Sequence, residues 1–314
     1  MFRFALILIL FCTALSAEPV YIGYSDYQIV TDTSFDANRY FSKMRSYGVN
    51  FQRIWALGFS GEKYERLPFV KKGRLYDLNK IDPRYLQRLR EVLRSARSHD
   101  QRVMLTLFDH WSLVDRDIFP RTPWFYKNNT DRLLKRPFPD FYDHSDVALR
   151  KIQENFVRTI VSATAEFHPI YEIMNEGALK SGCGLLKQWH EQVAIWILDE
   201  LPEAEIAVNV SRDCLEIVEQ PWVDMISFHG GFWLENGICN IVAEYSHLNK
   251  SILIDTDAAT KYRDDNKALR RWVREALECG ASFNHKDDIY SLDRQALKIF
   301  RQEVGAHGVR PSGR

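Results

Sequence analysis

Carboxylate side chains follow two short apolar runs in this sequence. Asn175 and Glu176 follow the run at 170–174, and Asp255, Thr256 and Asp257 follow the run at 251–254. If both runs are parallel strands, their carboxyl ends meet at one edge of the sheet. Two facing carboxyl groups can hydrolyse a glycosidic bond, one as proton donor and the other as nucleophile or base. The sequence therefore predicts a catalytic pair made of Glu176 and either Asp257 or Asp255.

Further polar and aromatic side chains end other predicted strands or lie in the loops that follow them. Such a mixture is typical of a sugar-binding cleft, because aromatic rings stack on the apolar faces of sugars while polar groups bind hydroxyls. The candidate substrate-binding residues are Arg53, Trp55, His110, Trp111, Trp124, Asn175, His229, Trp233 and His285.

Strands and amphipathic helices alternate along the chain. Continuous apolar strands are typical of a sheet buried on both faces, and eight strand–helix units predict an α/β fold, a single-domain (β/α)8 TIM barrel. The alternative is an open doubly wound sheet, but no glycine-rich phosphate loop follows the first strand, which also argues against a nucleotide cofactor. We expect no cofactor and no metal. The predicted strands are 20–23 or 27–30, then 50–56, 102–108, 170–174, 205–210, 223–228, 251–254 and 281–284. The predicted helices are 36–47, 82–99, 143–167, 185–201, 264–278 and 292–304.

The longest irregular segment is 112–143, and loops of that length are commonly functional walls or lids. It is rich in aromatic residues, which make up 13% of the chain. The 314 residues include 42 Lys and Arg against 42 Asp and Glu, so the formal net charge is zero. This balance argues against a nucleic-acid partner, which normally requires a basic protein surface. It fits an uncharged ligand such as a neutral carbohydrate.

The amino terminus has the three parts of a secretory signal peptide. Arg3 precedes an apolar run at 4–12, and small residues lead to Ala17, the expected cleavage point. We therefore expect residues 1–17 to be the signal peptide, 18–304 the barrel domain and 305–314 a disordered tail. The mature protein would be secreted, extracellular or periplasmic, without membrane contact, and a monomer.

Four cysteines remain after residue 17. Cys183, Cys214 and Cys239 follow predicted strands, so a disulfide among them would brace the edge where those strands end. Cys279 precedes a strand at the opposite end, and we expect it to be the free thiol. Four cysteines allow three complete pairings, between which the sequence does not choose.

Four segments resemble clan A glycoside hydrolases, the group of family-5-like cellulases and mannanases. The resemblance implies a TIM barrel that cleaves glycosidic bonds, with Glu176 as acid/base, Asn175 on a sugar hydroxyl and Arg53 supporting the nucleophile. It also implies that His110 and His229 orient substrate and carboxylates. The segments are Tyr47–Trp55, Val103–Trp111, Tyr171–Glu176 and Ser227–His229.

The sequence departs from that group at two strands. The group has a nucleophilic Glu on strand seven, where this chain places Thr256 between Asp255 and Asp257. On strand eight, Phe283–His285 stands where the group usually has a Trp. A shorter aspartate leaves open a retaining enzyme, an inverting enzyme and a barrel that binds sugar without cleaving it.

A metal-dependent hydrolase is a further alternative. Carboxylates and histidines at one rim could form a hard-ligand site. The residues concerned are Asp109, His110, Glu176, His229, Asp255 and His285.

Overall fold

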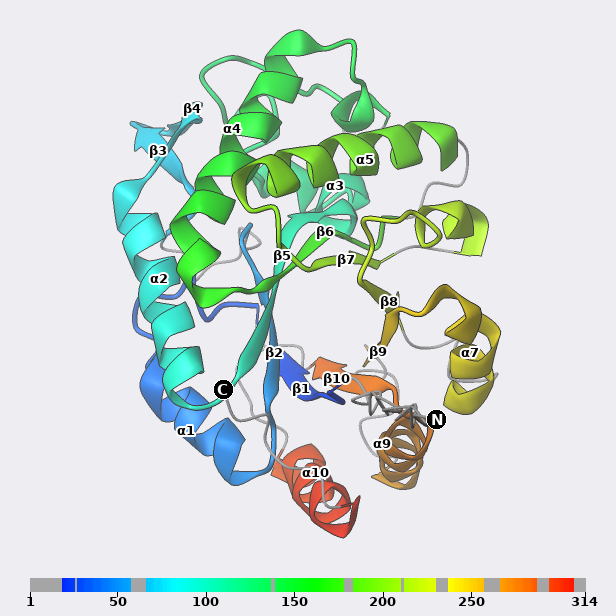
Figure 1. Ribbon diagram of the computed structural model, residues 1–314. Coiled ribbons are helices and arrows are strands. Elements are labelled where there is room, and N and C mark those ends of the chain that lie inside the picture. Colours follow the sequence, from blue (N-terminus) through cyan, green and yellow to red (C-terminus); the bar gives the residue numbers. More distant parts are fainter. Residues whose placement is uncertain are drawn as a thin grey trace, which may run out of the picture.

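Eight parallel strands close into a barrel in the computed structural model, which describes residues 19–25, 27–57, 66–136, 139–177, 183–209, 212–229, 237–256, 266–286 and 294–307 (Figure 1). β1 pairs with β2 on one side and with β10 on the other, so the sheet has no free edge. The predicted (β/α)8 barrel is confirmed, and the open doubly wound sheet is wrong. The barrel strands are β1 (Ile22–Ser25), β2 (Phe51–Trp55), β5 (Arg102–Asp109), β6 (Ile170–Asn175), β7 (Ile206–Asn209), β8 (Met225–His229), β9 (Ser251–Thr256) and β10 (Ser282–Lys286).

Amphipathic helices surround the barrel. Three of them begin where an aspartate side chain, at Asp36, Asp82 or Asp146, accepts a backbone N–H of the first turn. The last helix ends at His307, inside the segment expected to be a disordered tail, and 308–314 lie outside the described residues. The main helices are α1 (Ala37–Ser46), α2 (Pro83–Ser98), α4 (Val147–Thr164), α5 (Cys183–Glu200), α7 (Ile238–Tyr245), α9 (Asn266–Cys279) and α10 (Arg294–His307). Among the described residues, no helix combines the length and apolar character needed to cross a membrane.

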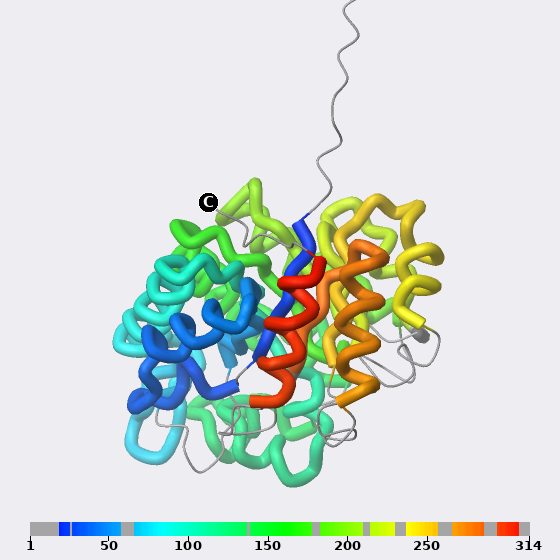
Figure 2. The backbone as a smooth tube through the Cα atoms, turned by 90° about the horizontal axis from the view of Figure 1, so that it is seen from below, coloured from blue at the N-terminus to red at the C-terminus, as the bar shows by residue number. Residues whose placement is uncertain are grey.

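A β-hairpin that the sequence analysis did not predict lies between β2 and α2. It consists of β3 (Phe69–Lys72) and β4 (Leu75–Ile81). The hairpin contacts the long segment after β5, which contains α3 (His110–Val114) and the short helices η1 (Phe119–Arg121) and η2 (Asp140–Tyr142). Both follow carboxyl ends of barrel strands and therefore lie on one face of the barrel. Figure 2 shows them on the side opposite the start of β1 and the end of α10.

Inside the barrel, two layers of side chains differ in character. The lower layer is apolar and closes the barrel at the amino ends of the strands; it consists of Tyr21, Phe51, Met104, Ile170, Ala207, Met225 and Leu253. Side chains alternate along a strand, so the next inward position lies two residues further on. Five completely buried side chains above the apolar layer form what we call the central polar layer: Arg53, Thr106, Glu172, Asp255 and Asn284.

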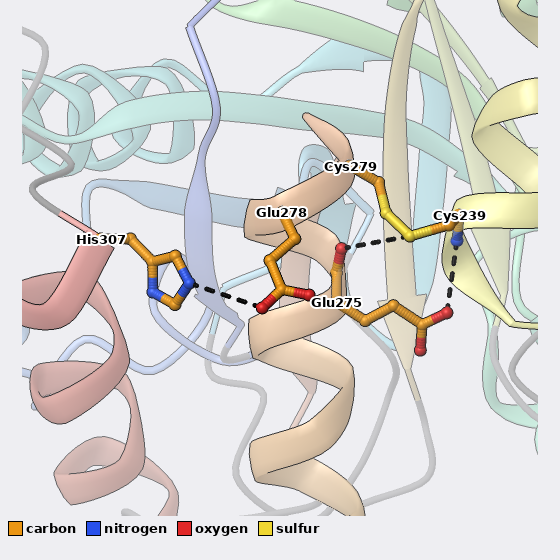
Figure 3. The surroundings of a disulfide bond; sticks show 5 residues. All are labelled: Cys239, Glu275, Glu278, Cys279 and His307. Atoms are coloured by element: carbon orange, nitrogen blue, oxygen red, sulfur yellow. Dashed lines mark hydrogen bonds and ion pairs between the residues drawn. A yellow bond between two sulfur atoms is a disulfide. The ribbon is translucent and has the colours of Figure 1, made fainter.

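Two disulfides join neighbouring segments, each with its two Cα atoms 5.3 Å apart. Cys183 at the start of α5 pairs with Cys214 in η4 (Arg212–Ile217), beside the carboxyl ends of β6 and β7. Cys239 at the start of α7 pairs with Cys279 at the end of α9 (Figure 3). The expectation of a free thiol at Cys279 is therefore wrong, because α7 begins beside the carboxyl end of α9.

Candidate functional site

Arg53 is the centre of the polar interior. Its guanidinium donates to Glu172 Oε2 from Nε at 2.9 Å and from Nη2 at 2.5 Å. Nη2 also donates to Asn175 Oδ1 at 2.7 Å, and Nη1 donates to Asp255. One buried cation therefore holds side chains from the fourth and seventh strands of the barrel, and a buried charge is tolerated only with such partners.

Asp255 is completely buried, and both of its carboxylate oxygens are engaged. Oδ2 accepts from Arg53 and lies 3.1 Å from His229 Nε2, while Oδ1 accepts from Asn284 Nδ2 at 2.7 Å. Burial alone would raise the pKa of Asp255, but the charges of Arg53 and His229 outweigh it and hold the pKa well below its usual range. Asp255 is thus a fixed anion beneath the mouth of the barrel.

Glu172 was not among the predicted site residues. It is completely buried, and its Oε2 also accepts from Thr106 Oγ1 at 2.5 Å. Burial raises the pKa of Glu172, against the opposing charge of Arg53. The signal that could have found it is a charged residue within the otherwise apolar run at 170–174.

His229 connects Asp255 to Glu176. Burial lowers the pKa of this histidine, but hydrogen bonds to the two carboxylates outweigh it and raise the pKa to about 10. The protonated ring donates from Nδ1 to Glu176 Oε1 at 3.0 Å and from Nε2 to Asp255 Oδ2 at 3.1 Å. Arg53 Nη1 lies 2.9 Å from Nε2, and its charge opposes this protonation. The site therefore contains a carboxylate–imidazolium–carboxylate chain.

Glu176 is the member of this chain that reaches solvent, with its side chain 32% exposed. Its backbone has φ +50°, in the left-handed region that non-glycine residues rarely adopt. The backbone N–H donates to Asn209 Oδ1 at 2.9 Å, which helps to hold this conformation at the end of β6. Burial raises the pKa of Glu176, but the bond from His229 outweighs it, so the pKa is lowered overall.

Asn175, Asp109 and His110 complete the site beside Glu176. Asn175 Nδ2 donates to Asp109 Oδ1 at 2.5 Å, and burial raises the pKa of Asp109 to about 6. His110 Nδ1 lies 2.6 Å from the hydroxyl of Tyr142. Burial lowers the pKa of His110 to about 4, so its imidazole is neutral at physiological pH.

The predicted aromatic platforms divide into exposed and buried residues. Trp111 on α3 is 41% exposed. Trp55 is buried, 4.6 Å from the Arg53 guanidinium and 4.0 Å from the ring of Tyr27, measured to ring centroids. Trp124 is only 3% exposed, so its expected role as a sugar platform does not fit its position.

The remaining predicted residues lie elsewhere. His285 is buried on β10, with its ring 5.5 Å from that of Tyr24. Asp257 and Trp233 lie outside the described residues. Within the part of the chain that the structure describes, no three His, Cys, Asp or Glu side chains are arranged to hold a metal ion.

Comparisons with known proteins identify the fold. The sequence matches no protein-family model and no curated protein sequence. Among solved structures, the chain is similar to an endo-beta-1,4-mannanase from Rhizomucor miehei, with a TM-score of 0.68 and 14% identity over 93% of this chain and 95% of that one. An endo-beta-1,4-mannanase from Thermotoga petrophila gives a TM-score of 0.67 and 14% identity over 93% of this chain and 77% of that one. The cellulose synthase subunit Z from Clostridioides difficile gives a TM-score of 0.60 and 14% identity over 89% of this chain and 99% of that one. The chain thus shares the TIM-barrel fold of these proteins.

Proposed function

We propose that this protein is a glycoside hydrolase that cleaves O-glycosidic bonds in an oligo- or polysaccharide. The observation that carries the proposal is Glu176, a partly exposed carboxylate at the barrel mouth, linked through His229 to the buried anion of Asp255. The structurally similar barrels include endo-beta-1,4-mannanases and a glycoside hydrolase family 5 mannosidase, and this similarity supports the reaction class. Carbohydrate is the corresponding substrate.

In the proposed mechanism, Glu176 transfers protons at the glycosidic oxygen. In the free protein the shared proton rests on His229 Nδ1, because the pKa of His229 is raised while that of Glu176 is lowered. Transfer of this proton to Glu176 would give the carboxylic acid that protonates the leaving group. Cleavage then returns Glu176 to the carboxylate, which can take a proton from the attacking water.

The second carboxylate is proposed to be Asp257 rather than Asp255. A nucleophile or base must reach the sugar, whereas Asp255 is completely buried with both oxygens engaged. We assign Asp255 a positioning role through His229. Asp257 is the next carboxylate along the chain, and lies outside the described residues.

The test is hydrolysis of a panel of polysaccharides by the wild type and by Glu176→Gln. Loss of one proton-transfer group typically lowers kcat by about 10²- to 10⁴-fold. Glu278→Gln, at an exposed position on α9, is the matched control and should retain full activity. Equal activity of wild type and Glu176→Gln would refute the assignment.

A second candidate is a barrel that binds carbohydrate without cleaving it. The complete burial of Asp255 favours it, since this removes one of the two expected catalytic carboxylates from the substrate. Calorimetry that detects sugar binding, together with no product after days at high protein concentration, would establish this candidate instead.

We also propose that the protein is exported and acts as a monomer. Two disulfides support export, because such bonds persist in oxidising compartments. Mass spectrometry of protein recovered outside the cytoplasm should give an amino terminus at Glu18. Gel filtration with light scattering should give the mass of one chain. A mature protein that retains residues 1–17 would contradict export by this route.

A further inference from the structure

Basic residues gather in two segments on the face of the barrel that carries Glu176. The hairpin residues 69–81 and the segment 119–136 together contain nine basic residues and two acidic ones. We call these two segments the basic lobe. Its formal charge is +7, whereas the whole chain is neutral, so the rest of the molecule carries −7. The basic residues are Lys71, Lys72, Arg74, Lys80, Arg121, Lys127, Arg132, Lys135 and Arg136.

The charges of the basic lobe face solvent, since all nine basic residues are exposed. Among the described residues, two of them form ion pairs: Lys72 with Asp77 at 2.9 Å and Arg136 with Asp140 at 3.2 Å. Asp131, the other acidic residue of the lobe, accepts from Asn79 and Thr130 instead. The lobe thus presents most of its positive charge to solvent.

The two segments of the basic lobe are fixed to each other. Tyr76 N–H donates to Asn128 C=O at 2.7 Å, and Thr130 N–H donates to Tyr76 C=O at 2.9 Å. The buried ring of Trp124 packs 5.3 Å from that of Phe69 in the hairpin. The charges therefore project from an ordered surface rather than from independent loops.

The lobe is also attached to the candidate site. Trp124 packs 5.3 Å from Phe141, next to Tyr142, whose hydroxyl lies 2.6 Å from His110 Nδ1. The segment after β5 leaves the barrel at His110 and returns to it at Tyr142. A polymer bound on the lobe would accordingly lie on the same face of the barrel as Glu176, and Figure 2 shows the lobe projecting from that face.

Two tyrosines of the lobe lie beside lysines. Lys71 Nζ is 5.3 Å from the ring centroid of Tyr76, and Lys127 Nζ is 5.7 Å from that of Tyr126. Both rings are partly exposed. An aromatic ring next to an ammonium group suits a sugar ring that carries a carboxylate, because the ring contacts the apolar sugar face while the ammonium pairs with the anion.

We propose that the basic lobe binds an acidic polysaccharide, one whose sugars carry carboxylates, and aligns it with Glu176. The proposal rests on the function proposed above and specifies its substrate class. It replaces the sequence-based expectation of an uncharged ligand. That expectation took the net charge of the whole chain, which conceals the separation of +7 on the lobe from −7 elsewhere.

The test measures binding to polygalacturonate, alginate and hyaluronan, with neutral galactomannan as comparison, in the Glu176→Gln background so that no substrate is consumed. The lobe variant Lys71→Glu/Arg74→Glu/Lys80→Glu should bind at least one of the acidic polymers about tenfold or more weakly at low salt, and added salt should weaken wild-type binding similarly. The control Arg271→Glu/Lys298→Glu/Arg301→Glu makes the same charge change at exposed positions of α9 and α10 and should bind like the parent. Unchanged thermal unfolding would show that the variants fold.

Three results would overturn the proposal: equal binding by the lobe variant and the control, galactomannan bound as tightly as the acidic polymers, or single-stranded DNA bound as tightly as they are. Cleavage assays with protein that retains Glu176 distinguish a failure of this inference from a failure of the proposed function. Suppose that a neutral glycan is cleaved only when Glu176 is present, and equally well with or without the lobe substitutions. The proposed glycoside hydrolase function would then stand, and the proposed role of the lobe would be refuted. If an acidic polymer binds through the lobe but no glycan is cleaved, the role of the lobe would stand and the proposed hydrolase function would be refuted.

Discussion

The central polar layer and the basic lobe use charge in opposite ways. In the barrel, Arg53 is completely buried and contacts two carboxylates and an amide. In the lobe, nine basic residues are exposed and the described structure pairs two of them with carboxylates. Buried charges must be paired, because their desolvation is costly, whereas exposed charges are stabilised by water and stay free to meet a ligand.

This contrast separates residues that hold the site from residues that recruit a substrate. Substitutions in the central polar layer should mainly change stability and the geometry of Glu176. Substitutions of charge in the lobe should leave stability alone and change binding.

The largest expected effect is that of Arg53→Ala. It would leave the buried Glu172 without its ion-pair partner and Asp255 with His229 alone, and breaking a buried pair typically costs about 3–5 kcal/mol. Urea denaturation should show this loss in the free energy of unfolding. Arg271→Ala on the exposed face of α9 should stay within about 0.5 kcal/mol of the wild type. A similar small change for Arg53→Ala would show that the layer does not depend on its arginine.

Trp124→Ala should have an effect nearly as large. The ring packs against aromatic residues of the hairpin, of β5 and of η2, and removal of a buried large side chain typically costs about 3–5 kcal/mol. Trp111→Ala is the matched control, since that ring is 41% exposed. We expect it to unfold like the wild type but to bind carbohydrate more weakly. If Trp124→Ala instead weakened carbohydrate binding without changing the free energy of unfolding, Trp124 would be a sugar platform after all.

The His229 chain should give a pH-dependent stability. Its pKa rises from an ordinary value of about 6.5 in the unfolded chain to about 10 in the folded protein. The stabilisation is therefore complete below about pH 6.5 and is lost as pH rises through about 10. Thermal unfolding of wild type and His229→Gln should show the wild type losing its advantage over that range. Parallel curves would mean that His229 is neutral in the fold.

The smallest expected effect is that of Lys80→Ala in the lobe. Because this lysine is exposed and pairs with no carboxylate in the described structure, the free energy of unfolding should change by less than about 0.5 kcal/mol. Differential scanning calorimetry would measure it. A loss above about 2 kcal/mol would show that the lobe charges support the fold rather than a ligand.

The barrel could be predicted from the sequence because strand and helix periodicities are local. The hairpin at 69–81 was missed because its strands carry charged residues at several positions, although Gly73, with φ +60°, marks its turn. Helix α7 was missed because it has eight residues and follows Gly237, which provides no side-chain cap. Both omissions concern elements whose local signals are weak.

The candidate site could be predicted only in part. Glu176, Asn175, Arg53 and His229 do meet, since strand ends converge in any barrel. Glu172 was overlooked because the two-residue alternation of a strand decides which face a side chain occupies, and the barrel interior exists only once the strands close. The pairing of Cys239 with Cys279 likewise depends on the contact between α7 and α9.

By itself, the sequence determined the alternation of strands and helices, and with it the polar residues that end each strand. Which of these residues are buried and which reach solvent depends on the tertiary structure. Asp255 is buried whereas Glu176 is partly exposed, and Trp124 is buried whereas Trp111 is exposed. The tertiary structure also brought two basic segments, separated by 37 residues, into one charged surface within a neutral chain. The physical reason is that residue type and spacing act along the chain, whereas burial and the electric field are set by segments that meet only when the chain folds.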